Sequence, residues 1–343
     1  MLRGLSKLLA GCGVVLSPAL ASAATLRVPA DHPTIQRAVD AARDGDRIRV
    51  SRGRYCGATL TKRVHLVGHG KPTIIGCDTS PQVTAGLRAG FYLPGTKGNS
   101  PASGSRIEGF RFDGRGVSNA NLAPLSFGVF ARFASDVRVS HNRFEGTVQA
   151  ITNTAGDRWI IKHNRVRGLT LLDCTTHCTG GDGIVIALAR GAIAVPGGNA
   201  DPLNRPEDNL VVGNWIEGKA PDGFAVFSMA GVLLLSADHT TVLANRVSLR
   251  DNPRADAVGQ GIVVSNSCCG LPASFLPGSR YSVVALNDGR KSEVAVLVEG
   301  AAGANTEGLF LRKNRGKVVV EGNELSTLAA RRVLAPVRAQ PTL

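Results

Sequence analysis

A short pattern recurs along this chain, and no other feature of the sequence limits its fold as strongly. In each copy, a run rich in valine, isoleucine or leucine leads to an asparagine. The copies are VRVSHNRFEG (137–146), WIIKHNRVRG (159–168), NLVVGNWIEG (209–218), TTVLANRVSL (240–249), YSVVALNDG (281–289) and LFLRKNRG (309–316). The first two copies start 22 residues apart, and the excess between later copies is rich in Gly, Pro and Asn, as loops are.

A second apolar run precedes several of these copies. These runs are GVFARF (128–133), GIVIA (183–187), GVLLLS (231–236) and GIVVSN (261–266). A period near 22 with two or three short strands describes one coil of a solenoid. Leucine does not recur at the spacing of a leucine-rich repeat, and a propeller blade needs about 40 residues. We therefore predict an all-β chain wound as a parallel β-helix, with coils about 4.8 Å apart.

In such a stack, equivalent residues of successive coils form columns along the axis. We expect one inward column of aliphatic side chains, formed by Val139, Ile161, Val211 and Val242. We expect a second column of asparagines that hydrogen-bond to one another along the axis, formed by Asn142, Asn164, Asn214 and Asn245. Asparagine also tolerates left-handed backbone, which predicts that these residues occupy the left-handed position of the turn.

The N-terminus has the features of an export signal. Arg3 and Lys7 precede an apolar stretch, and Ala21-Ser22-Ala23 has the small-x-small pattern of a signal peptidase site. We predict a signal peptide at 1–23 cleaved before Ala24, a β-helix domain at 24–327, and a C-terminal cap or tail at 328–343. An alternative is lipidation at Cys12, because residues 9–12 match a bacterial lipoprotein box.

Export determines how the charge of the chain is interpreted. Loss of Arg3 and Lys7 leaves 38 of the 40 basic residues against 26 acidic ones, a net charge of +12. For a secreted or periplasmic protein, this charge favours an acidic polysaccharide or the anionic cell envelope as partner, and not nucleic acid. No apolar run after the signal approaches the roughly 20 residues of a membrane span. The sequence leaves the oligomeric state open.

Six cysteines remain after cleavage, and an even number in an oxidising compartment predicts disulfides. Cys56 and Cys77 lie 21 residues apart, about one coil, so we predict that they are bonded. The other four, Cys174, Cys178, Cys268 and Cys269, allow three pairings. The string from Asp173 to Cys178 lacks a second cysteine pair at a zinc spacing, so we predict no metal site.

The opening of the mature chain adds a resemblance to a known family. VPADHPTIQRAVDAARDGDRIRVSRGRY (28–55) and HLVGHGKPTIIG (65–76) resemble the start of right-handed parallel β-helix proteins of the pectin-lyase-like superfamily. The residues at 34–42 form an amphipathic helix that would cover the first coil. The superfamily includes lyases, hydrolases, esterases, epimerases and non-catalytic proteins, so the resemblance implies a fold and leaves the activity open.

No recognisable catalytic motif accompanies this fold, and the catalytic residues stay unknown. One outward column contains polar residues, namely Gln149, Asp182, Gln260 and Glu293, but Ala230 interrupts it. Glycosidases need two carboxylates at a defined separation, and no such pair is evident. We interpret Asp182 as a turn residue. The cofactor is also unknown, although calcium would accompany a lyase-like activity according to the resemblance.

Basic residues recur beside the asparagines, and they are the candidate ligand-binding residues. Arginine or tryptophan follows the asparagine at Arg143, Arg165, Trp215, Arg246 and, if the last coil is in register, Arg315. Histidine precedes two of them, at His141 and His163. Arginine pairs bidentately with carboxylate or sulfate, so an outward column would offer one cation per coil to a polyanion. The alternative is a solvated turn where arginine prevents aggregation.

These observations favour an exported β-helix protein that binds or processes an acidic polysaccharide, with lyase-like or epimerase-like chemistry if it is an enzyme. One alternative is a non-catalytic structural or adhesive solenoid at the cell envelope. A second alternative is a periplasmic accessory protein for metal-centre maturation.

Overall fold

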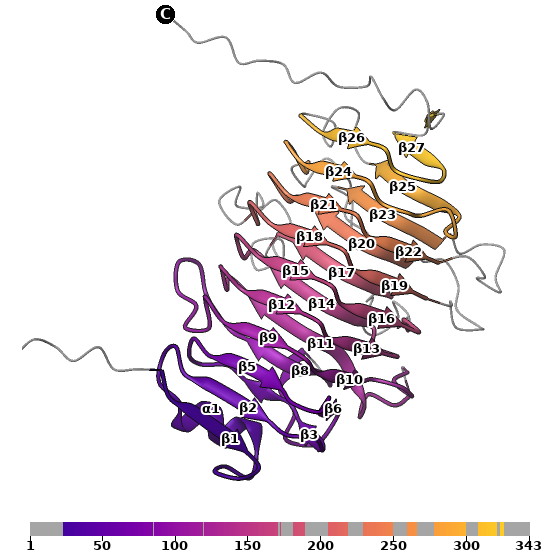
Figure 1. The fold of residues 1–343 in the computed structure, drawn as a ribbon. Coiled ribbons are helices and arrows are strands. Elements are labelled where there is room, and N and C mark those ends of the chain that lie inside the picture. The colour runs from indigo at the N-terminus through magenta and orange to yellow at the C-terminus, as the bar shows by residue number, and fades with distance from the viewer. Residues whose placement is uncertain are drawn as a thin grey trace, which may run out of the picture.

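Three long sheets surround one elongated core in the computed structural model (Figure 1). The structure describes residues 23–84, 86–118, 120–170, 172, 181–188, 205–218, 229–249, 259–265, 278–299, 308–320 and 323–325. In Figure 1 the strands of successive coils stack from the indigo N-terminal end to the yellow C-terminal end.

The central coils each contribute one strand to each sheet. The first sheet contains β1 (Thr25–Val28), β2 (Arg47–Val50), β5 (His65–Gly68), β9 (Arg106–Glu108), β12 (Arg138–Ser140), β15 (Ile160–Lys162), β18 (Leu210–Val212), β21 (Thr241–Leu243), β24 (Val283–Ala285) and β26 (Phe310–Arg312). The second contains β3 (Arg54–Cys56), β6 (Thr73–Ile75), β10 (Arg111–Asp113), β13 (Arg143–Glu145), β16 (Arg165–Arg167), β19 (Trp215–Glu217) and β22 (Arg246–Ser248).

The third sheet has the longest strands. It contains β4 (Ala58–Thr59), β7 (Gln82–Thr84), β8 (Leu87–Leu93), β11 (Leu125–Arg132), β14 (Gln149–Thr154), β17 (Asp182–Ala187), β20 (Met229–Leu235), β23 (Gly259–Ser265), β25 (Val294–Glu299), β27 (Val318–Val320) and β28 (Asn323–Leu325). All pairings are parallel except β7 with β8 and β27 with β28. Crossovers between parallel strands are right-handed. The predicted right-handed parallel β-helix, which is the fold of the pectin-lyase-like superfamily, is confirmed.

The core consists of the inward columns of the three sheets. Val139, Ile161, Val211 and Val242 are in register and have no exposed surface, as predicted. In the second sheet, Phe112 and Phe144 stack with their ring centroids 4.6 Å apart. Gly128 of the third sheet faces them, and a Cβ on that glycine would lie 2.4 Å from a ring carbon of Phe144. The aromatic pair therefore requires glycine on the opposite wall.

An asparagine ladder runs along the turns between the first and second sheets. It consists of Asn142, Asn164, Asn214, Asn245, Asn287 and Asn314. The Oδ1 of Asn164 accepts hydrogen bonds from the backbone N–H of Asn142 at 3.1 Å and from its Nδ2 at 3.2 Å. Asn164 in turn donates from its Nδ2 to the carbonyl of Val139 at 2.9 Å and to Oδ1 of Asn214 at 3.0 Å. The predicted ladder is confirmed and extends two coils further.

The prediction that these asparagines occupy left-handed backbone is wrong. The residue before each ladder asparagine has the positive φ, from 51° to 64° at His141, His163, Gly213, Ala244, Leu286 and Lys313. The reason is that the asparagine side chain must point inward along the axis while its own N–H pairs with the next coil. The chain reversal therefore falls on the preceding, exposed residue.

The N-terminal cap is α1 (Ile35–Ala41), close to the predicted 34–42. Its N-cap is Thr34, whose Oγ1 accepts a hydrogen bond from the backbone N–H of Arg37 at 3.2 Å. Ile35, Ala38 and Val39 are buried against the first coil. This short helix covers apolar surface that no earlier coil is available to bury.

The disulfide between Cys56 and Cys77 is present, as predicted, with the two Cα atoms 5.5 Å apart. It joins β3 to the turn after β6, in neighbouring coils. The other four mature cysteines, Cys12 and the tail at 328–343 lie outside the described residues. Within the part of the chain that the structure describes, no helix is long and apolar enough to cross a membrane.

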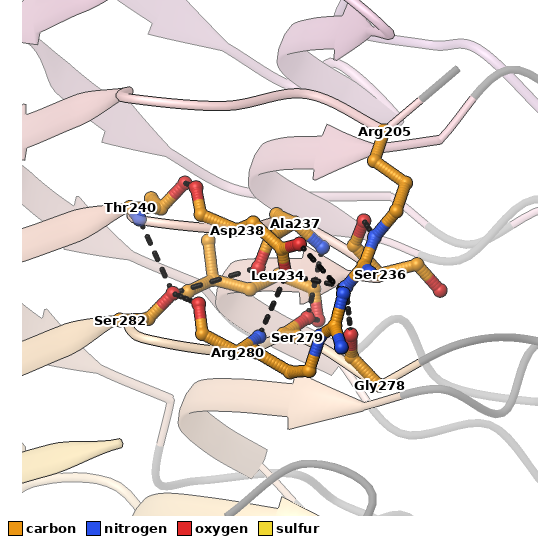
Figure 2. Close-up of polar contacts among 10 residues, drawn as sticks. All are labelled: Arg205, Leu234, Ser236, Ala237, Asp238, Thr240, Gly278, Ser279, Arg280 and Ser282. Atoms are coloured by element: carbon orange, nitrogen blue, oxygen red, sulfur yellow. Dashed lines mark hydrogen bonds and ion pairs between the residues drawn. The ribbon is translucent and has the colours of Figure 1, made fainter. Parts of the chain in front are cut away.

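A second polar network joins three coils at turns between the third and first sheets (Figure 2). The buried guanidinium of Arg205 donates to the carboxylate of Asp238 and to the carbonyl of Gly278. The same carboxylate accepts from the backbone N–H of Arg280 at 2.8 Å. A buried arginine and aspartate can stay charged only when they are paired in this way. The network therefore fixes the entry to the strands β18, β21 and β24.

We predict that Asn164→Ala lowers the free energy of unfolding by about 3 kcal/mol, because it leaves buried donors of Asn142 without acceptors. Urea denaturation followed by circular dichroism measures the change. Asn314→Ala is the matched control, since Asn314 is the last residue of the ladder and only partly buried. Asn314→Ala should lower the free energy of unfolding clearly less than Asn164→Ala does. Equal costs at the two positions would contradict the role assigned to the ladder.

A basic groove as candidate binding site

An open groove with a volume of about 1030 Å³ follows the turns between the first and second sheets in the N-terminal coils. Six cationic side chains line it: Arg52, Arg54, Lys71, Arg111, Arg143 and Arg165. His141 and His163 also line it, and none of the described lining residues is an aspartate or glutamate. The groove thus concentrates positive charge on one side of the helix.

The groove extends from two ladder coils into earlier coils whose turns are longer. Only His141 and Asn142 connect β12 to β13, whereas residues 69–72 connect β5 to β6. Glycines line this end of the groove, and the backbones of neighbouring coils approach closely there. A Cβ on Gly68 would lie 2.5 Å from the carbonyl oxygen of Gly109, and a Cβ on Gly109 would lie 2.7 Å from that of Gly68. Glycine at these two positions therefore allows the neighbouring backbones to approach each other along this part of the groove.

Two exposed histidines lie side by side in this groove. The rings of His141 and His163 have centroids 5.1 Å apart. The equivalent residues in the coils below and above are Gly109 and Gly213. A Cβ on Gly213 would lie 2.9 Å from the ring of His163, so that glycine makes room for the imidazole. The pair therefore forms an isolated imidazole surface between two positions without side chains.

Towards the C-terminal end of the groove, carboxylates of the protein itself form ion pairs with the arginines. Glu145, in β13, forms ion pairs with Arg111 and Arg143 of two neighbouring coils. The Nε of Arg143 donates to its Oε1 at 2.6 Å. Burial of the Glu145 carboxyl acts to raise its pKa, but the hydrogen bonds from the two arginines outweigh burial, and the pKa lies below its ordinary value. Glu145 is therefore charged and neutralises part of this column.

Two coils further, a similar arrangement occurs around Glu217. Its carboxylate lies 2.9 Å from Nε of Arg167 and 3.6 Å from a guanidinium nitrogen of Arg165. The Trp215 ring lies between two guanidinium groups, with Arg165 at 4.0 Å and Arg246 at 5.2 Å from the ring centroid. Trp215 therefore makes cation–π contacts within the column.

The predicted site residues are therefore only partly brought together. His141, Arg143, His163 and Arg165 line the groove, while Trp215 and Arg246 continue the same column beyond its lining. In the following coil the column is interrupted by an acidic residue. Asp288 lies between Arg246 and Arg315, so the column does not continue as an uninterrupted row of cations.

Sequence reasoning missed four lining cations: Arg52, Arg54, Lys71 and Arg111. Arg111 follows Phe110, which occupies the ladder position in its coil and donates its backbone N–H to Oδ1 of Asn142 at 3.0 Å. The string GFRFDG (109–114) matches the repeat except that Phe110 stands at the asparagine position. This partial match was the sequence signal that places Arg111 in the same column. The other three precede the first clear repeat.

A buried carboxyl lies at the outer face of the third sheet. Asp182 starts β17, so its interpretation as a turn residue is wrong. It pairs in register with Gln149, whose Nε2 lies 3.3 Å from Oδ2, and its Oδ1 accepts from the backbone N–H of Ala230 at 3.3 Å. Burial raises the pKa of Asp182 from 3.8 to about 6. The expected column partner Glu293 is also out of register, because Val294 pairs with Gln260.

Among the described residues, no group of three or more His, Cys, Asp or Glu side chains is arranged to hold a metal ion. The string from Asp173 to Cys178 lies outside them.

No protein-family model matches the sequence, and no curated protein does either. Solved structures with similar winding include an alginate lyase from Paenibacillus sp. str. FPU-7, at 13% identity over 87% of this chain and 98% of that one, with a TM-score of 0.45. A surface adhesin of Streptococcus pneumoniae, PfbA, matches at 12% identity over 83% of each chain, with a TM-score of 0.48. An exopolygalacturonase from Thermotoga maritima matches at 12% identity over 84% and 88%, with a TM-score of 0.39.

We predict that stability falls between about pH 4 and pH 6 because of Asp182. Its pKa in the folded state, about 6, lies above its ordinary value of 3.8. The folded state therefore gains stability from the protonated carboxyl below pH 4 and loses it as pH rises through 6. The loss amounts to about 3 kcal/mol, and Asp182→Asn should remove it. Urea denaturation across this pH range measures the loss of stability in the wild type and in Asp182→Asn.

Asp136→Asn is the control for this experiment. The pKa of Asp136 is lowered by hydrogen bonds from Arg158, so its contribution to stability has the opposite pH dependence. Its replacement should leave the fall between pH 4 and pH 6 in place. A wild-type stability that stays constant over this range would contradict the assignment.

Proposed function

We propose that this protein binds an acidic polysaccharide in the basic groove. The observation that carries the proposal is the groove itself, which collects six cations and two histidines with no carboxylate among its described lining residues. Arginine and lysine bind the carboxylate or sulfate groups of such a polymer by charge-assisted hydrogen bonds. Because the lining residues come from five successive coils, the groove is about 20 Å long, which suits an extended chain.

Two further points belong to this proposal, one on the mode of binding and one on the compartment. Calcium takes six to eight oxygen ligands, and the described lining provides no carboxylate for it, so we propose binding through arginine and lysine instead of a calcium bridge. We also propose that the protein is secreted or periplasmic after cleavage before Ala24. The disulfide between Cys56 and Cys77 supports an oxidising compartment.

If the protein also processes its ligand, the groove favours lyase-like or epimerase-like chemistry over hydrolysis. Both begin by removing a proton from the carbon next to a uronate carboxylate. An arginine that neutralises this carboxylate makes the proton more acidic, and a neutral imidazole of His141 or His163 could accept it. Glycoside hydrolysis instead uses two carboxylates, which the described lining lacks. The alternative is an adhesive solenoid that binds in the same groove without chemistry.

We predict that removing groove cations weakens binding to heparin and to polygalacturonate. The variant Arg54→Gln/Lys71→Gln/Arg143→Gln/Arg165→Gln should bind at least about 10-fold more weakly, since it removes two unpaired cations and two that are shared with protein carboxylates. Isothermal titration at fixed ionic strength measures the affinity. A control variant with the same loss of charge replaces four exposed arginines outside the groove, Arg37, Arg49, Arg106 and Arg312, by glutamine. It should bind as the wild type does, and equal losses would refute a specific groove.

Catalysis is tested with pectate, alginate and chondroitin as substrates. A lyase produces unsaturated uronides that absorb in the ultraviolet, and an epimerase changes the uronate composition without new chain ends. Either activity should disappear in His141→Gln/His163→Gln and persist in His239→Gln, which lies outside the groove. If the wild type leaves all three polymers unchanged, the non-catalytic alternative is favoured.

A further inference from the structure

The cations of the groove fall into two groups that differ in their partners. Arg111, Arg143 and Arg165 each form an ion pair with Glu145 or Glu217. Arg52, Arg54 and Lys71, here called the anchor cluster, are exposed and form no ion pair among the described residues. The unneutralised charge therefore lies at the end of the groove in the first two coils.

Binding of a ligand anion to the paired arginines carries a cost in free energy. The Glu145 side chain is only 11% exposed. A ligand anion that took Arg111 and Arg143 away would leave this carboxylate buried and without a partner, which costs several kcal/mol. The protein's own carboxylate is thus a built-in competitor for any external anion.

The anchor cluster also has a defined geometry. A Cβ on Gly70 would lie 3.2 Å from Cβ of Arg52, so the arginine of the first coil lies against the glycine next to Lys71 in the second. Arg54 starts β3 in register with Thr73 of β6, and the disulfide from Cys56 holds these two coils together. The cations therefore come from backbone that is already ordered before a ligand binds, which lowers the entropic cost of binding.

We propose that the anchor cluster is the primary subsite for the oxyanion groups of the ligand. The paired arginines Arg111, Arg143 and Arg165 make a smaller contribution, because Glu145 and Glu217 already bind them. This inference rests on the proposed function and assigns the first contact to residues outside the repeat. Its ligand is an oxyanion, either the carboxylate of a uronate or a sulfate ester, held by three cations around a surface without side chains.

Two variants with the same loss of charge test the proposal by titration with heparin fragments, which carry both groups, and with oligogalacturonate, which carries carboxylates alone. Arg52→Gln/Arg54→Gln/Lys71→Gln should lose about 30-fold in affinity. Arg143→Gln/Arg165→Gln/Arg246→Gln should lose only about threefold, because Arg143 and Arg165 are already paired with carboxylates and Arg246 lies outside the groove lining. Loss for heparin alone would identify sulfate as the anchored group, and loss for both ligands would identify the carboxylate.

A third variant keeps the test independent of folding. Glu145→Gln releases Arg111 and Arg143 from their shared partner and should raise affinity about fivefold, a change that damage to the fold does not produce. Thermal melting of all variants identifies any that unfold.

The outcomes separate the two proposals. If the wild type binds neither ligand, the proposed function fails and the anchor fails with it. If the wild type binds but Arg143→Gln/Arg165→Gln/Arg246→Gln loses as much affinity as Arg52→Gln/Arg54→Gln/Lys71→Gln, the anchor proposal is wrong and the groove proposal stands. The same conclusion follows if Glu145→Gln binds no better than the wild type.

Discussion

The hydrogen bonds between ladder asparagines determine more of this structure than any other interaction. Each ladder asparagine uses its amide to pair with the backbone and side chain of its neighbours, so its position within the turn is the same in every coil. Buried amides without partners would cost free energy in each coil. The ladder therefore sets the register between the first and second sheets, and with it the direction of the side chains on either side of each asparagine.

The groove extends from the first two coils of this ladder into the coils on its N-terminal side. Above Asn142 the turns are short and identical, and the residues after each asparagine form a compact column with internal counter-charges. In the next coil towards the N-terminus, Phe110 occupies the ladder position, and in the two coils before that one, longer turns that contain glycine replace the two-residue connection. A regular solenoid surface has few concavities, and departure from the repeat creates this one. The candidate site lies at the boundary between regular and irregular coils.

This boundary also separates what the sequence predicts from what it does not. The core column at Val139, the ladder, the cap over the first coil and the Cys56–Cys77 bond follow from period and patterning, because each depends on spacing within or between coils. The anchor cluster does not, since it lies before the first clear repeat. The partnership of Glu145 with two arginines was also missed, because it depends on how long side chains meet across coils. Asp182 was misjudged because local sequence does not report the depth of burial.

The positions of the cap and the disulfide have a consequence for how the molecule comes apart. In a stack of coils each coil is held mainly by its neighbours, so separation starts at an end. At the N-terminal end, α1 covers the core and a covalent bond joins the first coils. The described chain at the other end finishes with the short antiparallel pair β27 and β28. The basic groove therefore lies in coils that are capped and cross-linked, and it should persist when heat or mechanical load separates coils farther along the stack.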